Sequence, residues 1–153
     1  SLGHGLPIAI GISLAKKHDK EEGRIFCLIS DGELDCPSTW SSLLFASHHK
    51  LNNLVLIINN NGLQACGYKK DIIDVGDLKA KFEAFNWDYY EVDGHDFEEL
   101  EKIFGTTDLS LKPSVINAKT VKGKNISFAE NDNAWHYNNL TGELYNQAMK
   151  ENA

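Results

Sequence analysis

Two short polar segments of this chain carry residue types that can bind a metal ion together. Asp31 comes one serine after the apolar run of residues 24–29 (RIFCLI), and Asn59 to Asn61 follow the apolar run of residues 54–58 (LVLII). Both runs are typical of buried strands, and the carboxyl ends of parallel strands meet at the edge where open α/β sheets bind ligands. Mg²⁺ prefers oxygen ligands, usually one or two carboxylates together with phosphate oxygens. Asp31, the side-chain oxygen of Asn61 and a nearby backbone carbonyl are therefore candidate ligands.

The spacing of apolar residues predicts elements that would hold these segments in place. Strands alternate with helices, which indicates an α/β fold with a parallel sheet and helices on both faces, in one domain over residues 1–153. Residues 60–76 are expected to form a long loop, and residues 121–139 show no periodicity. The expected strands cover residues 24–30, 54–59, 87–92 and 114–118, and the expected helices cover residues 6–17, 37–50, 78–85, 97–104 and 141–150.

Local signals add detail to these helices. Pro37 suits a first helical turn, and Asp77 and Asp96 are good N-caps. The helix of residues 6–17 is apolar on most sides, which predicts that it is buried. Trp40 and Trp87 are expected in the core. The side chains expected to face inward from the helices of residues 37–50 and 141–150 are Leu43, Leu44, Ala46, Leu144, Tyr145 and Ala148.

Composition excludes several classes of protein. The 153 residues carry a net charge of −7 without a basic cluster, which argues against a nucleic-acid partner. No apolar run approaches the roughly 18 residues of a membrane span, so no membrane partner is expected. Cys27, Cys36 and Cys66 are odd in number and lack metal-binding spacing, so we expect reduced thiols in the cytoplasm.

The two polar segments resemble the thiamin diphosphate motif, which begins Gly-Asp-Gly and ends with Asn. The resemblance extends along the chain in the order of the transketolase family, and it is closest to the diphosphate-binding, N-terminal half found as a small subunit in split transketolases. The segments that carry it are Ser1–Leu6 (SLGHGL), Asp31–Leu34, Trp40, His48–Leu54, Asn61–Gln64, Lys119–Lys124 and Trp135–His136.

The resemblance implies a thiamin diphosphate-binding fold with thiamin diphosphate and Mg²⁺ (or Ca²⁺) as cofactors. The side chains of Asp31 and Asn61 and the backbone carbonyl of Leu63 would bind the metal ion. His136 would contact the diphosphate and the reacting substrate, as the catalytic residue. The remaining cofactor-binding residues would be Leu2 and Gly3 beside the thiazolium ring, Gly32 with its backbone N–H on the diphosphate, and Glu33.

The implied activity is transfer of a two-carbon ketol unit between sugar phosphates. In the family, the glutamate that activates the cofactor belongs to a separate pyrimidine-binding domain, which a partner subunit would supply, in a heterotetramer. The resemblance also leads us to expect a further segment before Ser1 that carries other cofactor and substrate contacts.

The chain departs from the family pattern at several positions. Ser30 replaces the first motif glycine, which is tolerable if its φ is negative. Cys36 and Ser41 stand where the family has glutamates that link paired active sites, and Asp35 lies next to the first of them. His4 replaces a common glutamine and Tyr137 a common glycine.

These departures leave alternatives open. The chain can be a degraded transketolase-like subunit that binds a partner and has only a structural role, or an unrelated phosphate-binding α/β domain. Lys122 and Lys124 can meet a substrate phosphate or form a solvated turn. We expect His48, His49 and His95 to be structural or solvated.

Overall fold

The structure, a computed structural model, describes residues 2–107 and 110–152. Strands and helices alternate over most of this length. The elements are α1 (Gly5–Asp19), β1 (Ile25–Ser30), the 3-10 helix η1 (Asp31–Asp35), α2 (Pro37–His48), β2 (Leu54–Asn60), β3 (Leu63–Gln64), β4 (Gly67–Tyr68), α3 (Lys69–Ile72), α4 (Leu78–Ala84), β5 (Asp88–Asp93), α5 (Phe97–Thr107), β6 (Ser114–Lys119), the 3-10 helix η2 (Asn133–His136) and α6 (Gly142–Glu151).

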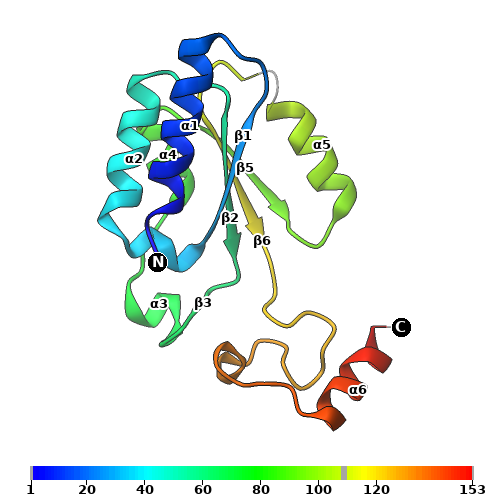
Figure 1. Ribbon diagram of the computed structural model, residues 1–153. Helices are drawn as coiled ribbons and strands as arrows, with labels where there is room; N and C mark the ends of the chain where they lie inside the picture. The colour runs from blue at the N-terminus through cyan, green and yellow to red at the C-terminus, as the bar shows by residue number, and fades with distance from the viewer. Residues whose placement is uncertain (1, 108–109, 153) are drawn as a thin grey trace.

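Four parallel strands form the central sheet, in the order β1-β2-β6-β5 (Figure 1). Ser30 pairs with Asn59, and Asn59 pairs with Ala118, so the carboxyl ends of three strands are level at one edge. β3 and β4 form a separate antiparallel hairpin beyond that edge. The predicted parallel α/β sheet is confirmed.

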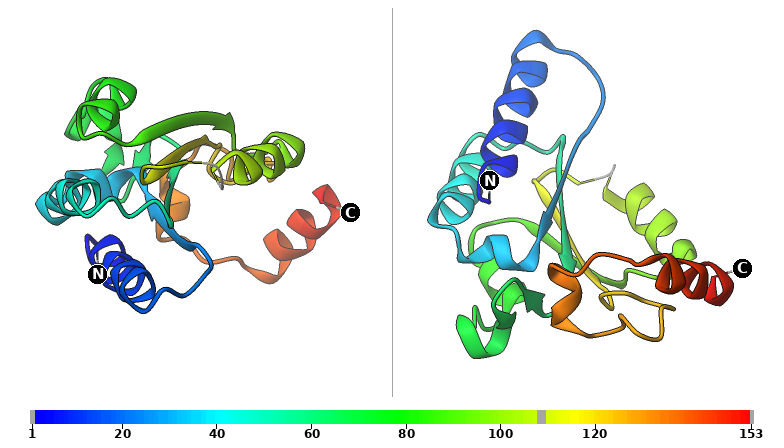
Figure 2. Two further views of the ribbon diagram at one scale, coloured as in Figure 1. Left: turned by 90° about the horizontal axis from the view of Figure 1, so that it is seen from above. Right: turned by 60° about the horizontal axis from the view of Figure 1, so that its bottom comes forward.

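Helices cover both faces of the sheet, as predicted (Figure 2). α1, α2 and α4 pack on one face around a core that includes Leu43, Leu56 and Trp87. α5 covers the other face, where its apolar side chains pack on Val55 and Ile116. Helix capping also follows the predictions, because Asp77 accepts from the backbone N–H of Ala80, and Asp96 from those of Glu98 and Glu99.

Five local predictions are wrong. The run of residues 24–29 is not a buried strand, because β1 lies at the edge of the sheet and its Phe26 and Leu28 are 48% and 67% exposed. Residues 60–76 are not a plain loop, because they contain β3, β4 and α3. α1 is buried only where it faces the sheet, since Ile8 and Ile12 lie on its outer side and are 62% and 49% exposed. Leu44 and Tyr145 do not face inward; Leu44 lies on the outer side of α2, and Tyr145 on α6 is also exposed.

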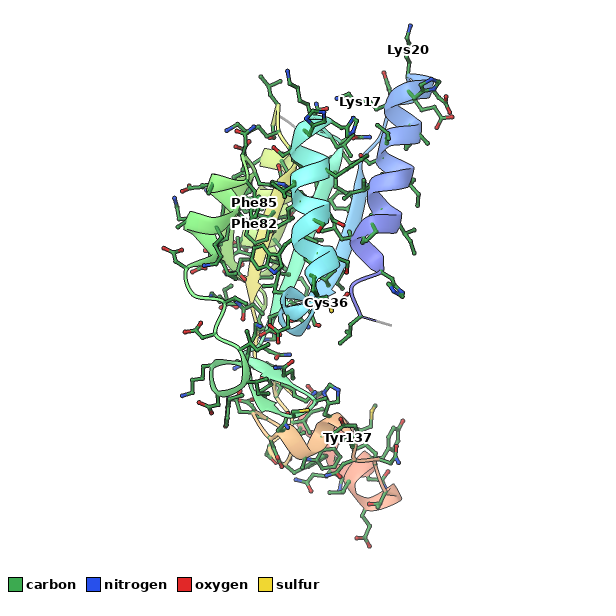
Figure 3. The ribbon with its side chains drawn as sticks, turned by 90° about the vertical axis from the view of Figure 1, so that its left-hand side faces the viewer. Lys17, Lys20, Cys36, Phe82, Phe85 and Tyr137 are labelled. Carbon is green, nitrogen blue, oxygen red and sulfur yellow. The ribbon has the colours of Figure 1, made fainter. Side chains whose placement is uncertain are left out.

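The segment that follows β6 leaves the sheet at the carboxyl ends of its strands (Figure 1). It includes η2 and α6, and it lies beyond the hairpin of β3 and β4. Figure 3 shows Tyr137 in this segment, and it shows Cys36 at the start of α2, at the end of that helix nearer to the segment. None of the helices formed by the described residues combines the length and apolar character that a membrane crossing requires.

The neighbouring leucines of α2 provide a test of this packing. Leu43 is fully buried, whereas Leu44 is 58% exposed. Leu43→Ala should lower the free energy of unfolding by about 2–5 kcal/mol, because it leaves a cavity in the core. Leu44→Ala should change it by less than about 0.5 kcal/mol. Chemical denaturation of both variants measures the difference, and equal losses would contradict the observed orientation of α2.

Candidate metal and cofactor site

Asp31 is the centre of the candidate site. It is the first residue of η1, directly after β1, and only 1% of its surface is exposed. Its Oδ2 accepts a hydrogen bond of 2.8 Å from the backbone N–H of Gly62. Its Oδ1 is buried and has no hydrogen-bond partner among the described residues. Since a buried carboxylate oxygen without a partner is costly, this atom is suited to receive a cation.

The environment of Asp31 changes its acidity. Burial raises the pKa of the carboxyl above its ordinary value of 3.8, against the opposing effects of the backbone N–H groups of Gly62 and Gly32 and of the Lys69 ammonium. Desolvation dominates because it penalises the charged form. A bound divalent cation would reverse that penalty, which is the behaviour expected of a metal ligand.

Asn61 directly follows β2 and precedes Gly62, whose backbone N–H bonds to Asp31. Oδ1 of Asn61 accepts a hydrogen bond of 2.9 Å from the backbone N–H of Leu63, so the side chain caps the turn into the hairpin. An amide oxygen has a second lone pair, which leaves it able to bind a cation. The next residue, Gly62, donates its backbone N–H to Asp31. Its carbonyl accepts a 2.9 Å hydrogen bond from the backbone N–H of Lys69.

The candidate oxygen ligands suit Mg²⁺ better than they suit a metal ion that protein side chains bind without help from a ligand. In residues 2–107 and 110–152, no group of three or more His, Cys, Asp or Glu side chains can hold a metal ion. A site with one carboxylate, one amide oxygen and one backbone carbonyl needs further oxygens from a ligand. Mg²⁺ is commonly bound in this way, together with phosphate oxygens. The residues present therefore fit a magnesium–diphosphate group.

Glu33 holds the N-terminal segment against η1. Its Oε2 accepts from the backbone N–H of Gly3 at 3.0 Å, and its Oε1 accepts from that of Ser30 at 3.3 Å. Ser38 donates to the carbonyl of Gly3 at 2.8 Å. Ser30 has φ −82°, so serine is tolerated at the first motif position, as expected. Gly3 thus lies at the same edge as Asp31, while the side chain of Leu2 is exposed.

Gly32 lies in a tight place. A Cβ on this residue would lie 3.3 Å from the side chain of Gln64 in β3. The hairpin therefore packs against Gly32 so closely that a side chain at this position would contact Gln64. The resemblance alone predicts that its N–H meets a diphosphate, and that prediction stays open.

His136 lies in the C-terminal segment that follows β6. It is the last residue of η2, and its side chain is exposed beside Tyr137, with ring centroids 5.1 Å apart. Asn133 of the same turn donates to the carbonyl of Ala65 at 3.3 Å, which joins η2 to the hairpin. This contact brings η2 to the hairpin, and a role for His136 stays a prediction.

His49 and His95 make structural contacts, as expected. His95 Nε2 accepts from the backbone N–H of Val121, and His49 stacks on Phe45. Lys124 is exposed. Trp87 is buried in the core, and Trp40 packs against that core, as predicted.

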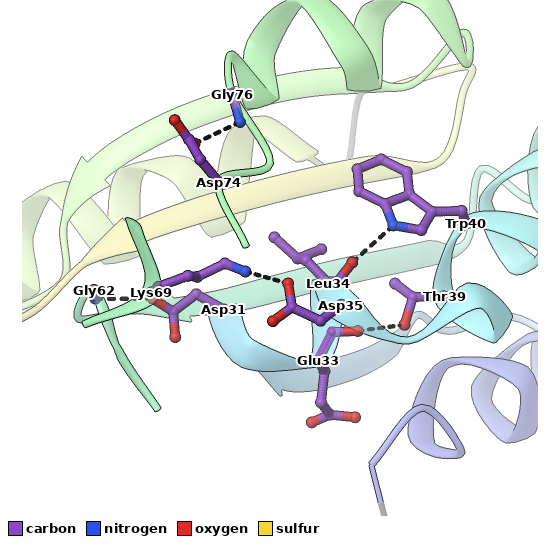
Figure 4. Close-up of polar contacts among 10 residues, drawn as sticks. All are labelled: Asp31, Glu33, Leu34, Asp35, Thr39, Trp40, Gly62, Lys69, Asp74 and Gly76. Carbon is purple, nitrogen blue, oxygen red and sulfur yellow. Dashed lines mark hydrogen bonds and ion pairs between the residues drawn. The ribbon is translucent and has the colours of Figure 1, made fainter. Parts of the chain in front are cut away.

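Sequence reasoning missed Lys69. This residue is buried, and its Nζ lies 2.5 Å from Oδ1 of Asp35, at the end of η1 (Figure 4). It lines a cavity of about 590 Å³ together with Asp31, Asn60 and Asn117. The sequence offers no clear signal for it, because Lys69 belongs to a polar stretch that was expected to be a loop.

Known proteins resemble the chain over nearly its whole length. The family described as "Transketolase, thiamine diphosphate binding domain" matches residues 1–152. The chain is 37% identical over 151 residues to an apulose-4-phosphate transketolase subunit from Actinobacillus succinogenes, with 99% of this chain and 55% of the relative covered. It is 34% identical over 152 residues to a 6-deoxy-6-sulfo-D-fructose transketolase subunit from a Clostridium species, again with 99% of this chain and 55% of the relative covered.

A solved structure shows the same fold. The crystal structure of a transketolase from Campylobacter jejuni superposes with a TM-score of 0.93 at 29% identity, over 98% of this chain and 25% of that chain. The chain thus spans about half the length of the transketolase subunits that it matches, and a quarter of that transketolase.

The packing of Gly3 gives one prediction. Its φ is +76°, and an added Cβ would lie 2.5 Å from Oγ of Ser38 and 2.8 Å from Cβ of Cys36. Gly3→Ala should lower the free energy of local opening of residues 2–4 by about 1–3 kcal/mol, and amide hydrogen exchange measures this change. Gly5→Ala is the matched control, because its nearest atom would be Cys27 Sγ at 3.7 Å. Equal exchange in both variants would show that Gly3 is not constrained.

The pKa of Asp31 gives a second prediction. A raised folded-state pKa means that the stability from the protonated carboxyl is complete below pH 3.8 and is lost as the pH rises through the folded-state pKa. In the metal-free protein, Asp31→Asn should therefore become more stable relative to wild type as the pH rises above 3.8. Denaturation at several pH values measures this. The exposed Asp19→Asn is the control, and a constant difference for Asp31→Asn would contradict the prediction.

Proposed function

The chain belongs to the family of transketolase thiamin diphosphate-binding domains, and on that premise we propose that it is the diphosphate- and magnesium-binding part of a transketolase. The proposed reaction transfers a two-carbon ketol unit between sugars or sugar phosphates. The observation that carries the proposal is the buried, unpartnered Oδ1 of Asp31 within the described residues, at the sheet edge that also holds Asn61.

Each residue at this edge has a proposed task. Asp31, Asn61 and the backbone carbonyl of Leu63 would bind Mg²⁺, or Ca²⁺ in its place. Gly32 would present its backbone N–H to the diphosphate, and Leu2 and Gly3 would lie beside the thiazolium ring. The observed contacts of Glu33 suggest that its contribution is to hold Gly3 in place.

Thiamin diphosphate, when bound, supplies the reactive carbon that accepts and releases the two-carbon unit. The protein contributes orientation and charge. The metal ligands would fix the diphosphate end of the cofactor. Because an imidazole can both donate and accept a proton, His136 would donate a hydrogen bond to the diphosphate and exchange a proton with the substrate.

We further propose that a partner chain completes the site. Two of the relatives are named as transketolase subunits and are covered over about half their length. The outer sides of α1 and α2 expose Ile8, Ile12, Leu44 and Phe45, and an exposed apolar surface of this kind is typical of an interface. The partner would be a pyrimidine-binding transketolase subunit, in a heterotetramer.

The relatives suggest the substrate class. Their names mention apulose 4-phosphate and 6-deoxy-6-sulfo-D-fructose, both sugars that carry a phosphate or sulfonate group. We propose a sugar or sugar phosphate for this protein. We also propose that residues 1–153 form one diphosphate-binding domain, and that it works in the cytoplasm, because Cys27, Cys36 and Cys66 are all free thiols.

Cofactor binding provides the test. Mg²⁺ and thiamin diphosphate are titrated by calorimetry into the complete native assembly, purified with any chain that accompanies it. We expect saturable, metal-dependent binding. Asp31→Ala should weaken it by more than about 100-fold, because loss of groups that merely support a ligand already costs about 10–100-fold. Asp19→Ala, far from the edge, should bind as wild type does.

Three outcomes separate the candidate functions. Metal-dependent binding followed by turnover with a ketose donor supports the transketolase. Undiminished cofactor binding in Asp31→Ala contradicts the proposed role of Asp31 as a metal ligand. No binding by a folded, complete wild-type assembly leaves the degraded, structural subunit.

A further inference from the structure

We propose that Lys69, through its buried ion pair with Asp35, is a positioning residue that holds the hairpin segment of residues 62–72 on η1 and keeps Asp31 and Asn61 placed for one cation. The inference rests on the proposed function, because it assumes that Asp31 and Asn61 bind Mg²⁺ together with a diphosphate. Neither Lys69 nor Asp35 needs to touch the Mg²⁺ ion or the diphosphate.

The ion pair is strongly buried. Nζ of Lys69 lies 2.5 Å from Oδ1 of Asp35, and the two side chains are 9% and 15% exposed (Figure 4). A buried ammonium that loses its carboxylate is left as an uncompensated charge, which the protein tolerates poorly. The two segments that carry these side chains are therefore held together firmly.

The pair closes a ring of contacts that includes Asp31 and lies next to Asn61. η1 begins with Asp31 and ends with Asp35, which pairs with Lys69. The backbone N–H of Lys69 donates to the carbonyl of Gly62, and the N–H of Gly62 donates back to Oδ2 of Asp31. Asn61 directly precedes Gly62. Opening the ring at the ion pair would therefore free both candidate ligands.

The same pair settles what Asp35 does. Cys36 and Ser41 stand where the resemblance leads one to expect glutamates, and Asp35 is the carboxylate next to the first of them. Its side chain is directed to Lys69 of the same chain instead. One oxygen of Asp35 is therefore engaged within this domain.

A direct role for Lys69 is the competing explanation. Its side chain lines the same cavity as Asp31, and an ammonium has three donors, of which Asp35 takes one. A direct contact to an anionic ligand predicts that only Lys69 substitutions weaken binding. Positioning predicts that changes at Asp35 and Lys69 have equal effects that do not add, because either change opens the same ring.

The test uses the complete native assembly with Asp35→Asn, Lys69→Met and the double variant. Binding of Mn²⁺ alone is followed by electron paramagnetic resonance, and Mg²⁺ with thiamin diphosphate by calorimetry. We expect about tenfold weaker metal binding in each single variant and no further loss in the double variant, in line with groups that support metal ligands. Asp35→Glu, which keeps the carboxylate, should recover most of the affinity.

Lys70→Met is the matched control. Lys70 is the exposed neighbour of Lys69 and lines the same cavity, so it tests whether loss of any positive charge there has the same effect. Wild-type affinity in this variant supports the proposal. An equal loss, or a loss in Lys69→Met without one in Asp35→Asn, overturns it.

A measurement without ligand separates this proposal from the proposed function. Amide hydrogen exchange of the metal-free assembly should accelerate at residues 62–72 in both single variants, and it should stay unchanged in α5 on the far face. Unchanged exchange at residues 62–72 overturns the proposal even if wild type binds the cofactor. Failure of wild type to bind would overturn the proposed function, while the exchange result would still decide whether the ion pair holds the segment. Asp35→Asn is nearly isosteric, so it keeps the test open if Lys69→Met does not fold.

Discussion

The burial of the Asp31 carboxylate at the end of β1 is the constraint on which the site depends. One oxygen is satisfied by the backbone N–H of Gly62, and the other has no partner among the described residues. Burial makes the charged form unfavourable and raises the pKa of the group. The Lys69 ammonium and backbone N–H groups compensate only in part. The domain thus holds an unfavourable arrangement that a divalent cation would relieve, which is how a binding site differs from an ordinary turn.

η1 transmits this constraint to the surrounding segments. Its glutamate, Glu33, holds the N-terminal segment by the backbone N–H of Gly3, and its last residue, Asp35, holds the hairpin through Lys69. The five residues of η1 therefore connect the N-terminal segment and the hairpin at one sheet edge. Cys36, just beyond, packs its Cβ where a side chain on Gly3 would lie. The small thiol at this position contributes to packing around Gly3, whatever its consequence for contacts with a partner.

Several apolar side chains of the domain lie outside its core, on the outer sides of α1 and α2. The sheet face covered by α1, α2 and α4 is well packed, yet Ile8, Ile12 and Phe45 remain exposed on the far sides of the helices. A groove between α1 and α2 is lined in part by Pro7, Gly11 and Phe45. Isolated exposed apolar residues are common, but several of them on two helices that border a groove favour a protein interface. This surface supports a partner-dependent site on grounds independent of the relatives' names.

By itself, the sequence determined the alternation of strands and helices, the helix caps and the placement of Asp31 and Asn61 at strand ends. These follow from local periodicity and from the run of apolar residues that a buried strand requires. It did not determine that Ile8 and Leu44 face outward, because an apolar helix shows no polar face to orient it. Nor did it reveal the hairpin in residues 60–76 or the pairing of Asp35 with Lys69, which are 34 residues apart. Such contacts depend on how the hairpin packs on η1, and only the tertiary structure brings the two charges out of water together.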